Sequence, residues 1–370
     1  MKLFTRIISP FLRITSLFKS IDKNAYLTQY NPGYEWWWHS FIGVHNETNE
    51  RKPFFIEYYT IKNNPELKSQ SIQFQKPSYF MLKAGTWGED AKEINNYYNL
   101  NAVKLDTNKM NINVVNSDFE INANDKHIKG TVMDFANKLT WNLNLNKLYS
   151  YDLGYTTNRF SRFFNFAQMY WHIPGVKTEY NGTVIYNNNT YIVDKKTSIG
   201  YQDKNWGTHY TDKWVWLNCN HFYHYPNTSI VVGGAIPVVF NIKLFETLII
   251  VLFHNNKKYE FNFSKFWNSL SQKINIYKSK SDKEYIIFQI ETENSEIKLN
   301  IDFKCDVNKM FKIKYQDLSG NIPHRNLYNG HHGIGKIIIY DKKSKKETYL
   351  YGDYAGCEYG EIVDRKIEKK

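Results

Sequence analysis

The segment 200–220 places a carboxylic acid among tryptophans and asparagines, a combination suited to proton transfer in an apolar pocket. It contains Asp203 next to Lys204, three tryptophans and three asparagines. Sheets usually sort apolar and polar side chains onto different faces, but here both kinds share a face. This mixture is typical of a strand that lines a ligand cavity rather than a dry core.

Because side chains alternate along a strand, the faces of this segment can be assigned. We expect a hairpin whose turn lies at 208–213. Asp203 and Asn205 share one face of its first strand, while Lys204 and Trp206 share the other. Ordinary aromatic pairing that only stabilises a sheet is the alternative interpretation. The return strand carries an aromatic face with amide tips, formed by Trp214, Trp216, Asn218 and Asn220.

The same segment resembles the signature of the tocopherol cyclase family. Asp-Lys-Asn-Trp-Gly at 203–207 is similar to the family's Ala-Glu-Lys-Asn-Trp-Gly. Trp-x-Trp at 214–216 and Cys-Asn at 219–220 are similar to its Trp-Phe-Trp-Val-Gln-Cys-Asn. Glu-Trp-Trp-Trp-His-Ser at 35–40 resembles the family's Glu-Gly-Trp-Tyr-Phe-Lys, and 171–180 resembles bacterial members. The resemblance extends from about Pro32 to Glu361.

Three positions depart from the family pattern. The family's glutamate in the central motif is Asp203 here, the glycine after the first glutamate is Trp36, and the glutamine is Asn218. The shorter acid moves its proton by about an ångström or more, and errors of that size matter to catalysis. A changed substrate or a loss of activity is therefore one expectation.

The resemblance implies a cofactor-independent, acid-catalysed cyclisation of a prenylated phenol, quinol or related prenyl lipid. In this reaction a phenol oxygen adds to an alkene of the prenyl tail, with no redox cofactor and no metal. The site must protonate the alkene, stabilise the tertiary cation and exclude water. A hydratase of a similar lipid would need the same acid. Non-catalytic, lipocalin-like carriage of a hydrophobic lipid or pigment is the alternative function.

Three residues are candidates for the acid and base roles. Asp203 is the expected proton donor, because an aromatic pocket favours its neutral form and raises its pKa. Alternation places Lys204 on the other face. Glu35 is a second candidate acid, and His172 could accept the phenol proton. Each has a structural alternative: a polar network for Asp203, backbone capping for Glu35 and a hydrogen-bonded structural role for His172.

The remaining candidates would contact the substrate. Trp214 and Trp216 could present ring faces to a cation, and Asn218 and Asn220 could hold phenol oxygens. The histidines at 331–332 are adjacent, and we expect them in a loop rather than at a metal site. The full set of expected substrate-binding residues is Trp37, Lys204, Asn205, Trp206, Trp214, Trp216, Asn218 and Asn220.

Many short strand signals separated by turn residues predict an all-β fold of antiparallel barrels or sandwiches. Aromatic residues, which favour strands, make up 17% of the 370 residues. The family resemblance implies two lipocalin-like β-barrel halves. A few short helices are expected, at 158–170 as a connector and at 261–270. The expected organisation is a basic amphipathic segment (1–22), two β domains (23–165 and 166–362) and a charged tail (363–370).

Charge and cysteine content narrow the choice of partners and compartment. The formal net charge of +12 permits contact with anionic membranes, but no nucleic-acid-binding motif accompanies it. Three cysteines far apart predict no disulfide framework, which fits a reducing, cytoplasmic location. Residues 1–20 predict a helix that either lies on a membrane surface or packs on the protein. The apolar segment 230–253 predicts two buried strands rather than a membrane span.

Overall fold

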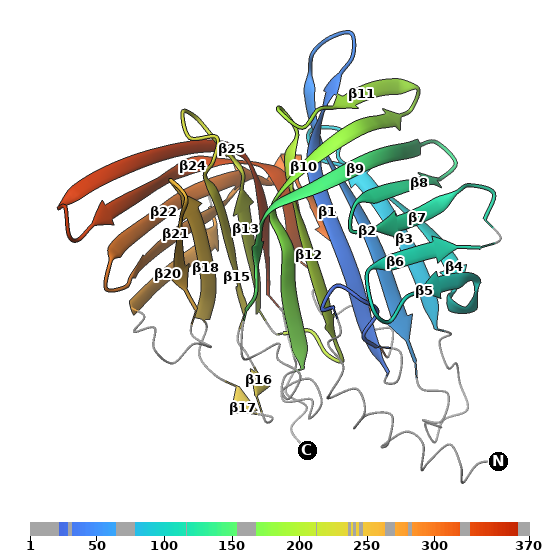
Figure 1. Ribbon diagram of the computed structural model, residues 1–370, viewed down its shortest axis with the longest axis horizontal. Coiled ribbons are helices and arrows are strands. Elements are labelled where there is room, and N and C mark those ends of the chain that lie inside the picture. The colour runs from blue at the N-terminus through green and yellow to red at the C-terminus, as the bar shows by residue number, and fades with distance from the viewer. Residues whose placement is uncertain are drawn as a thin grey trace.

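The computed structural model describes most of the chain as antiparallel β-structure. The described residues are 22–28, 32–63, 78–115, 117–153, 168–211, 213–235, 238–239, 242–243, 247–262, 271–279, 283–318 and 326–361. In these ranges the only helices are two 3-10 turns, Leu100–Ala102 and Val307–Lys309. The strands form two large sheets that lie side by side in Figure 1. The predicted all-β architecture in two halves is confirmed.

The first sheet is built from the N-terminal half of the described chain. Its order is β4-β3-β2-β1, then β11 and β12, then β10-β9-β8-β7-β6-β5. Both β11 and β12 lie between β1 and β10, at opposite ends of these long strands. Its strands are β1 (Gly33–His45), β2 (Arg51–Lys62), β3 (Tyr79–Thr86), β4 (Lys92–Asn99), β5 (Val103–Leu105), β6 (Asn111–Val114), β7 (Ile121–Asn124), β8 (His127–Met133), β9 (Lys138–Tyr151), β10 (Met169–Tyr186), β11 (Asn189–Val193) and β12 (Ile199–Gly207).

The second sheet is built from the C-terminal half. Its order is β19-β18-β15-β13-β25-β24-β22-β21-β20, with β14 on β25 and β23 on β24. A separate two-stranded sheet pairs β16 (Val238–Val239) with β17 (Ile242–Lys243). The strands of the second sheet are β13 (Lys213–Cys219), β14 (His221–Phe222), β15 (Ser229–Ala235), β18 (Thr247–His254), β19 (Lys257–Phe261), β20 (Ser271–Lys278), β21 (Tyr285–Glu293), β22 (Ile297–Asp306), β23 (Phe311–Ile313), β24 (Leu327–Asp341) and β25 (Lys346–Glu361).

The buried apolar residues form three clusters, one within each sheet and a third between the sheets. Alternation sorts each central strand between two of them. On β1, Trp37 belongs to the core of the first sheet, whereas Trp36 and Trp38 belong to the cluster between the sheets. On β13, Leu217 belongs to the core of the second sheet and Trp216 to the cluster between the sheets. The central strands are therefore buried on both faces.

The expected hairpin at 200–220 is wrong. The two sides of β12 are occupied by β1 and β10, while those of β13 are occupied by β15 and β25. The intervening residues therefore carry the chain from one sheet to the other. The aromatic faces meet across the interface instead of within one sheet, as the ring centroids of Tyr201 and Trp216 show at 5.2 Å.

Three smaller expectations have different outcomes in the structure. The expected helices at 158–170 and 261–270 lie largely outside the described residues, and their described ends belong to strands β10 and β19. The histidines at 331–332 lie within β24, not in a loop. The segment 230–253 contains β15 and β18, which pair antiparallel as expected.

The change from one sheet to the other falls between Gly207 and Lys213. The predicted boundary of the folding units at 165/166 stays a prediction, because strand pairing alone does not show which part folds independently. The amphipathic segment 1–20 and the tail 363–370 lie outside the described residues. In the described part, no helix is long and apolar enough to cross a membrane.

Candidate functional site between the sheets

Two of the motifs that resemble the family signatures, 35–40 and 203–207, lie on the neighbouring antiparallel strands β1 and β12. Trp38 of β1 pairs with Asp203 of β12, and Trp37 pairs with Lys204. Paired residues share a face of the sheet. Trp38 and Asp203 therefore face the second sheet, whereas Trp37 and Lys204 face the interior of the first. The motifs supply two separate polar sites, one on each face.

On the interior face, Glu35 and Lys204 form an ion pair that is fully buried. Their charged atoms are 2.6 Å apart, and both side chains are 0% exposed. Glu35 also accepts hydrogen bonds from the backbone amides of Leu27 and Thr28 and from the Thr28 hydroxyl. The carboxylate is thus occupied by donors from segment 22–28. This is a structural anchor, and it matches the capping alternative for Glu35.

Lys204 is held in the same way. Its Nζ donates to the backbone carbonyls of Lys23 and Ala25 and lies 5.0 Å and 5.1 Å from the ring centroids of Trp37 and Trp206. Charges buried in this way are tolerated because every partner is in place. Trp37, Lys204 and Trp206 surround the anchor of segment 22–28. That they bind substrate stays a prediction.

His172 also belongs to this face. It pairs with Lys204 across β10 and β12, so it points away from Asp203. Burial, followed by the positive charge of Lys204, lowers the pKa of His172 to about 3. The structure therefore separates His172 and Glu35 from Asp203, with which the sequence had grouped them.

Asp203 is the acid that faces the second sheet. Its side chain is 9% exposed, and its Oδ2 accepts hydrogen bonds from Trp171 Nε1 at 2.9 Å and from the Tyr201 hydroxyl at 3.0 Å. Oδ1 is buried and makes no hydrogen bond of ordinary geometry to any described residue. Burial raises the pKa of Asp203 to about 7, although the bonds from Trp171 and Tyr201 act to lower it. As expected from the sequence, a large fraction is protonated near neutral pH.

Tryptophans from both sheets surround this acid. The Trp216 ring contacts Tyr201, and the Trp214 ring lies 5.8 Å from Trp36. The indole Nε1 atoms of Trp38, Trp214 and Trp216 are buried without a hydrogen-bond partner among the described residues. Buried donors usually have partners, so this concentration of unpaired groups indicates space for a polar ligand or water.

The asparagines of the motif differ in their surroundings. Asn220 donates to the carbonyls of Val176 and Gly200 in the first sheet and accepts from Ser229 in the second. Asn218 donates to the carbonyl of Ile230. Both therefore have structural partners, and Asn220 joins the sheets. Asn205 is different, because its Oδ1 is buried without a partner in the described part of the chain.

A second group of buried polar residues between the sheets was not found from the sequence. Glu57 of β2 and Lys83 of β3 form an ion pair at 2.8 Å, with Nζ 4.5 Å from the centre of the Tyr315 ring. Across the interface, Glu358 of β25 accepts a hydrogen bond from Asn329 of β24. Burial raises the pKa of Glu358 to about 8, and the carboxylates of Glu57 and Asp203 add to the effect.

The sequence does carry one signal for these groups. Glu57 is the single charged residue in the apolar run Phe-Phe-Ile-Glu-Tyr-Tyr at 54–59, and Glu358 follows Ala-Gly-Cys at 355–357. A charged residue alone in a buried strand costs free energy unless it has a partner or a function. Which partners it meets depends on strands far away in the sequence.

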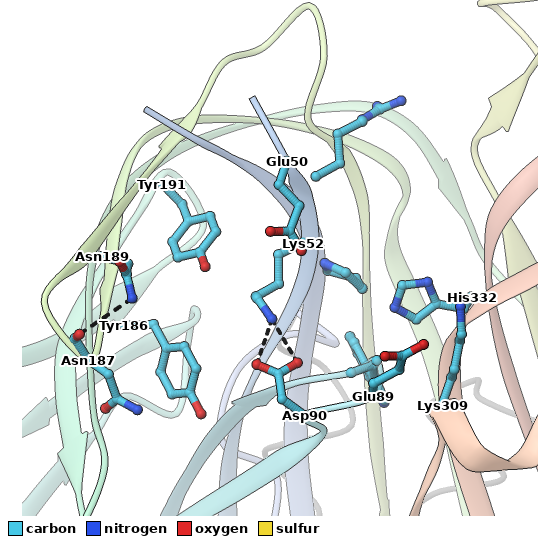
Figure 2. Close-up of a pocket in the computed structure, with 14 residues that line it drawn as sticks. Glu50, Lys52, Glu89, Asp90, Tyr186, Asn187, Asn189, Tyr191, Lys309 and His332 are labelled. Carbon is cyan, nitrogen blue, oxygen red and sulfur yellow. Dashed lines mark hydrogen bonds and ion pairs between the residues drawn. The ribbon is translucent and has the colours of Figure 1, made fainter. Parts of the chain in front are cut away.

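An open cleft borders this region and is shown in Figure 2. It has a volume of about 780 Å³ and is lined by residues of both sheets, including the ion pair of Lys52 with Asp90 at 2.8 Å. Trp87 lines the cleft and also donates from Nε1 to Asn329 at 2.8 Å. Trp87 thus lies between the cleft and the buried polar group. Within the described ranges, no cluster of three His, Cys, Asp or Glu residues could hold a metal ion.

Comparisons with known proteins agree with this architecture. The family model described as tocopherol cyclase-like matches residues 66–317. Kievitone hydratase from Nectria haematococca has a similar structure, with a TM-score of 0.51, 15% identity and coverage of 93% of this chain and 96% of its own. For a protein described as an AttH from Nitrosomonas europaea, the TM-score is 0.49 and the identity 11%. The match covers 89% of this chain and 93% of that protein. No curated protein matches by sequence. At 15% identity, the likeness to kievitone hydratase shows the fold alone.

Proposed function

This chain belongs to the tocopherol cyclase-like family, and we propose that it is a cofactor-independent acid catalyst of prenylated phenols or quinols. Asp203 gives its proton to an alkene carbon of the prenyl tail, which leaves a tertiary cation. The phenol oxygen attacks this cation, and the phenol proton is lost as the ring closes. The carboxylate of Asp203 then takes up a proton, so the reaction is an isomerisation with no net change in composition.

The burial of Asp203, with one carboxylate oxygen held and the other unpaired among the described residues, is the observation that carries this proposal. Its pKa of about 7 keeps a proton available near neutral pH. Trp171 and Tyr201 fix Oδ2, and Oδ1 remains for the substrate. A general acid with a pKa near the working pH combines availability with driving force.

The surroundings of Asp203 support the later steps of the reaction. The rings of Trp36, Trp214 and Trp216 lie in the same layer between the sheets, where they could stabilise the cation by about 0.5 to 2 kcal/mol each. Burial on both sides keeps water from the cation.

The test uses a prenylated methylhydroquinone as the probe and mass spectrometry of the products. The proposal expects an isomer of equal mass from the wild type, and a rate that falls as pH rises above about 7. Asp203→Asn should slow the reaction by at least about 100-fold and still bind the probe. Asp302→Asn, at an exposed position of β22, is the matched control and should keep the wild-type rate. Full activity of Asp203→Asn would exclude this acid.

One observation favours a second candidate function, the carriage of a hydrophobic lipid. Trp36 replaces the family's glycine, and its ring stacks on Tyr315 with centroids 5.0 Å apart. The indole therefore fills space between the sheets that a glycine would leave open. In the same assay, carriage would give a bound probe that is released unchanged, whereas a product heavier by one water would identify a hydratase. Membrane contact through residues 1–20 stays a prediction, which vesicle sedimentation of a chain lacking them would test.

A further inference from the structure

His331 is a buried histidine with no partner for either ring nitrogen. It lies on β24 and is 4% exposed, and neither Nδ1 nor Nε2 makes a hydrogen bond to any described residue. Its ring stacks on Trp87 with centroids 5.1 Å apart. A buried imidazole without partners is costly, because both nitrogens have given up their bonds to water. The position therefore indicates a bound group that supplies these hydrogen bonds.

The groups around His331 favour a neutral ligand. Burial lowers the pKa of His331 to about 3, so the ring is uncharged and offers one donor and one acceptor. Glu358, which lies opposite Asn329 on the neighbouring strand, is 5% exposed and carries a proton near neutral pH. The positive charge of Lys83 is matched by Glu57. Because its charge is matched, Lys83 offers little attraction to a carboxylate or phosphate ligand.

The walls of this position are aromatic. Trp87 packs against Phe55 at 4.8 Å and against Phe311 at 6.0 Å between ring centroids. Flat apolar surfaces together with a neutral donor and acceptor suit a hydroxyl group on an aromatic ring.

His331 and Asp203 are connected through Trp216. Trp216 contacts Tyr201, which donates to Asp203, and it pairs across the strands with Glu358. A Cβ at Gly356 would meet both the Trp216 ring, at 2.4 Å, and the His331 ring, at 3.4 Å. The two polar positions thus flank one indole, as a ligand with a hydroxyl at one end and an alkene further along would require.

We propose that His331 and Glu358 bind the ring hydroxyl of a phenol or quinol, and that His331 accepts the proton of this hydroxyl as the C–O bond forms. This inference rests on the proposed function and assigns to His331 the role that the sequence suggested for His172. The proton gained by His331 balances the one given by Asp203, and exchange with solvent restores both groups. His331 and Glu358 lie beyond residue 317, where the family match ends.

The experiment measures binding rather than turnover. The probes are a methylhydroquinone with a saturated prenyl tail, which cannot be protonated, and its dimethyl ether, which lacks both hydroxyls. Titration calorimetry gives both affinities. We expect the wild type to prefer the hydroquinone by about tenfold, which is the effect of one or two buried hydrogen bonds. His331→Phe should lose this preference and keep its affinity for the ether. Glu358→Gln, which retains a donor, should keep part of the preference.

His332→Phe is the matched control, because it changes the next imidazole, which lines the cleft in Figure 2. It should keep the tenfold preference. If His331→Phe does not fold, as judged by its thermal melting, His331→Ala replaces it with the same expected loss. A wild type that does not prefer the hydroquinone, or a His331 variant that keeps the preference, overturns the inference. Asp203→Asn should bind like the wild type, so failure of the acid and failure of this site give different results.

Discussion

Trp171 of β10 donates its indole N–H to Oδ2 of Asp203 on β12, over 2.9 Å. The same indole packs against Gly233 of β15 in the second sheet, where an added Cβ would lie 2.2 Å from the ring. The N–H edge of Trp171 thus binds the candidate acid, while the other end of the same ring packs against the opposite sheet. The orientation of the acid depends on how closely the two sheets approach.

Replacing Trp171 should change the acidity of Asp203 in a defined direction. Trp171→Phe removes a donor that favours the charged form, so the pKa of Asp203 should rise above about 7, by about one unit. The pH above which the rate declines should rise together with the pKa of Asp203. The carboxyl stretch in infrared difference spectra, assigned with Asp203→Asn, reports this pKa directly.

Two further variants make that measurement decisive. Tyr201→Phe removes the other donor to Oδ2 and should raise the pKa in the same direction. Trp214→Phe removes an indole N–H with no partner among the described residues, so the pKa of Asp203 should not move. A shift in Trp214→Phe as large as that in Trp171→Phe would mean that the volume of the indole ring, not its hydrogen bond, sets the pKa.

The raised pKa of Asp203 should also make the protein less stable as pH rises. An unfolded aspartate has a pKa of about 4, whereas the folded value is about 7. Between these values the folded state binds more protons than the unfolded state, so the free energy of unfolding falls as pH rises, and the loss is complete above about pH 7. Three pKa units correspond to a loss of up to about 4 kcal/mol.

Asp203→Asn tests this sign, because the amide stays neutral at every pH. The variant should gain stability over the wild type from about pH 4 to pH 7 and keep a constant gain above that range. Urea unfolding at pH 4, 6 and 8 measures the difference. Glu57 and Glu358 also contribute to the pH dependence. Because the charge of Asp203 helps to raise the pKa of Glu358, its removal lowers that pKa and adds to the gain at high pH. A gain that is largest at pH 4 would contradict the raised pKa.

The ion pair of Glu35 and Lys204 should prove structural rather than catalytic. Glu35→Gln leaves Lys204 buried without its counter-charge, which should cost about 3 to 5 kcal/mol of stability. The double variant Glu35→Gln with Lys204→Met should recover part of this loss. The pH dependence of the rate should stay unchanged, because Glu35 faces away from Asp203.

Urea unfolding and limited proteolysis of segment 22–28 are the measurements. Glu291→Gln, which breaks exposed contacts of 3.8 Å and 3.7 Å with Lys273 and Lys298, is the control and should cost less than about 1 kcal/mol. If Glu35→Gln is fully folded but its rate is strongly reduced, Glu35 becomes a candidate for the catalytic acid again.

The parts of the site that were predicted correctly depend on local regularity. The period of two along a strand placed Asp203 and Lys204 on opposite faces, and separated Trp216 from Leu217. The apolar surroundings that raise the pKa of Asp203 followed from the tryptophans nearby in the sequence. These inferences need no knowledge of which strands are neighbours.

Strand pairing itself could not be predicted from the same pattern. The residues after Gly207 look like a turn, but whether a turn joins neighbouring strands depends on the other strands that compete for each edge. Glu57, His331 and Glu358 come from β2, β24 and β25, and only the packing of the two sheets brings them into one layer. For the same reason the sequence identified His172 and missed His331.

Adding a methyl group at Gly233 should test how the approach of the sheets controls the acid. Gly233→Ala forces the Trp171 ring to move, because the new Cβ would lie 2.2 Å from it, and overpacking of this kind costs about 1 to 3 kcal/mol. Gly356→Ala is the matched variant, since its Cβ would lie 2.4 Å from the Trp216 ring. Both should lower the melting temperature by a similar amount. Only Gly233→Ala should raise the infrared-detected pKa of Asp203, because Trp171 donates to its carboxylate and the Trp216 ring does not. If Gly356→Ala raised that pKa equally, the general separation of the sheets, rather than the position of Trp171, would set the acidity.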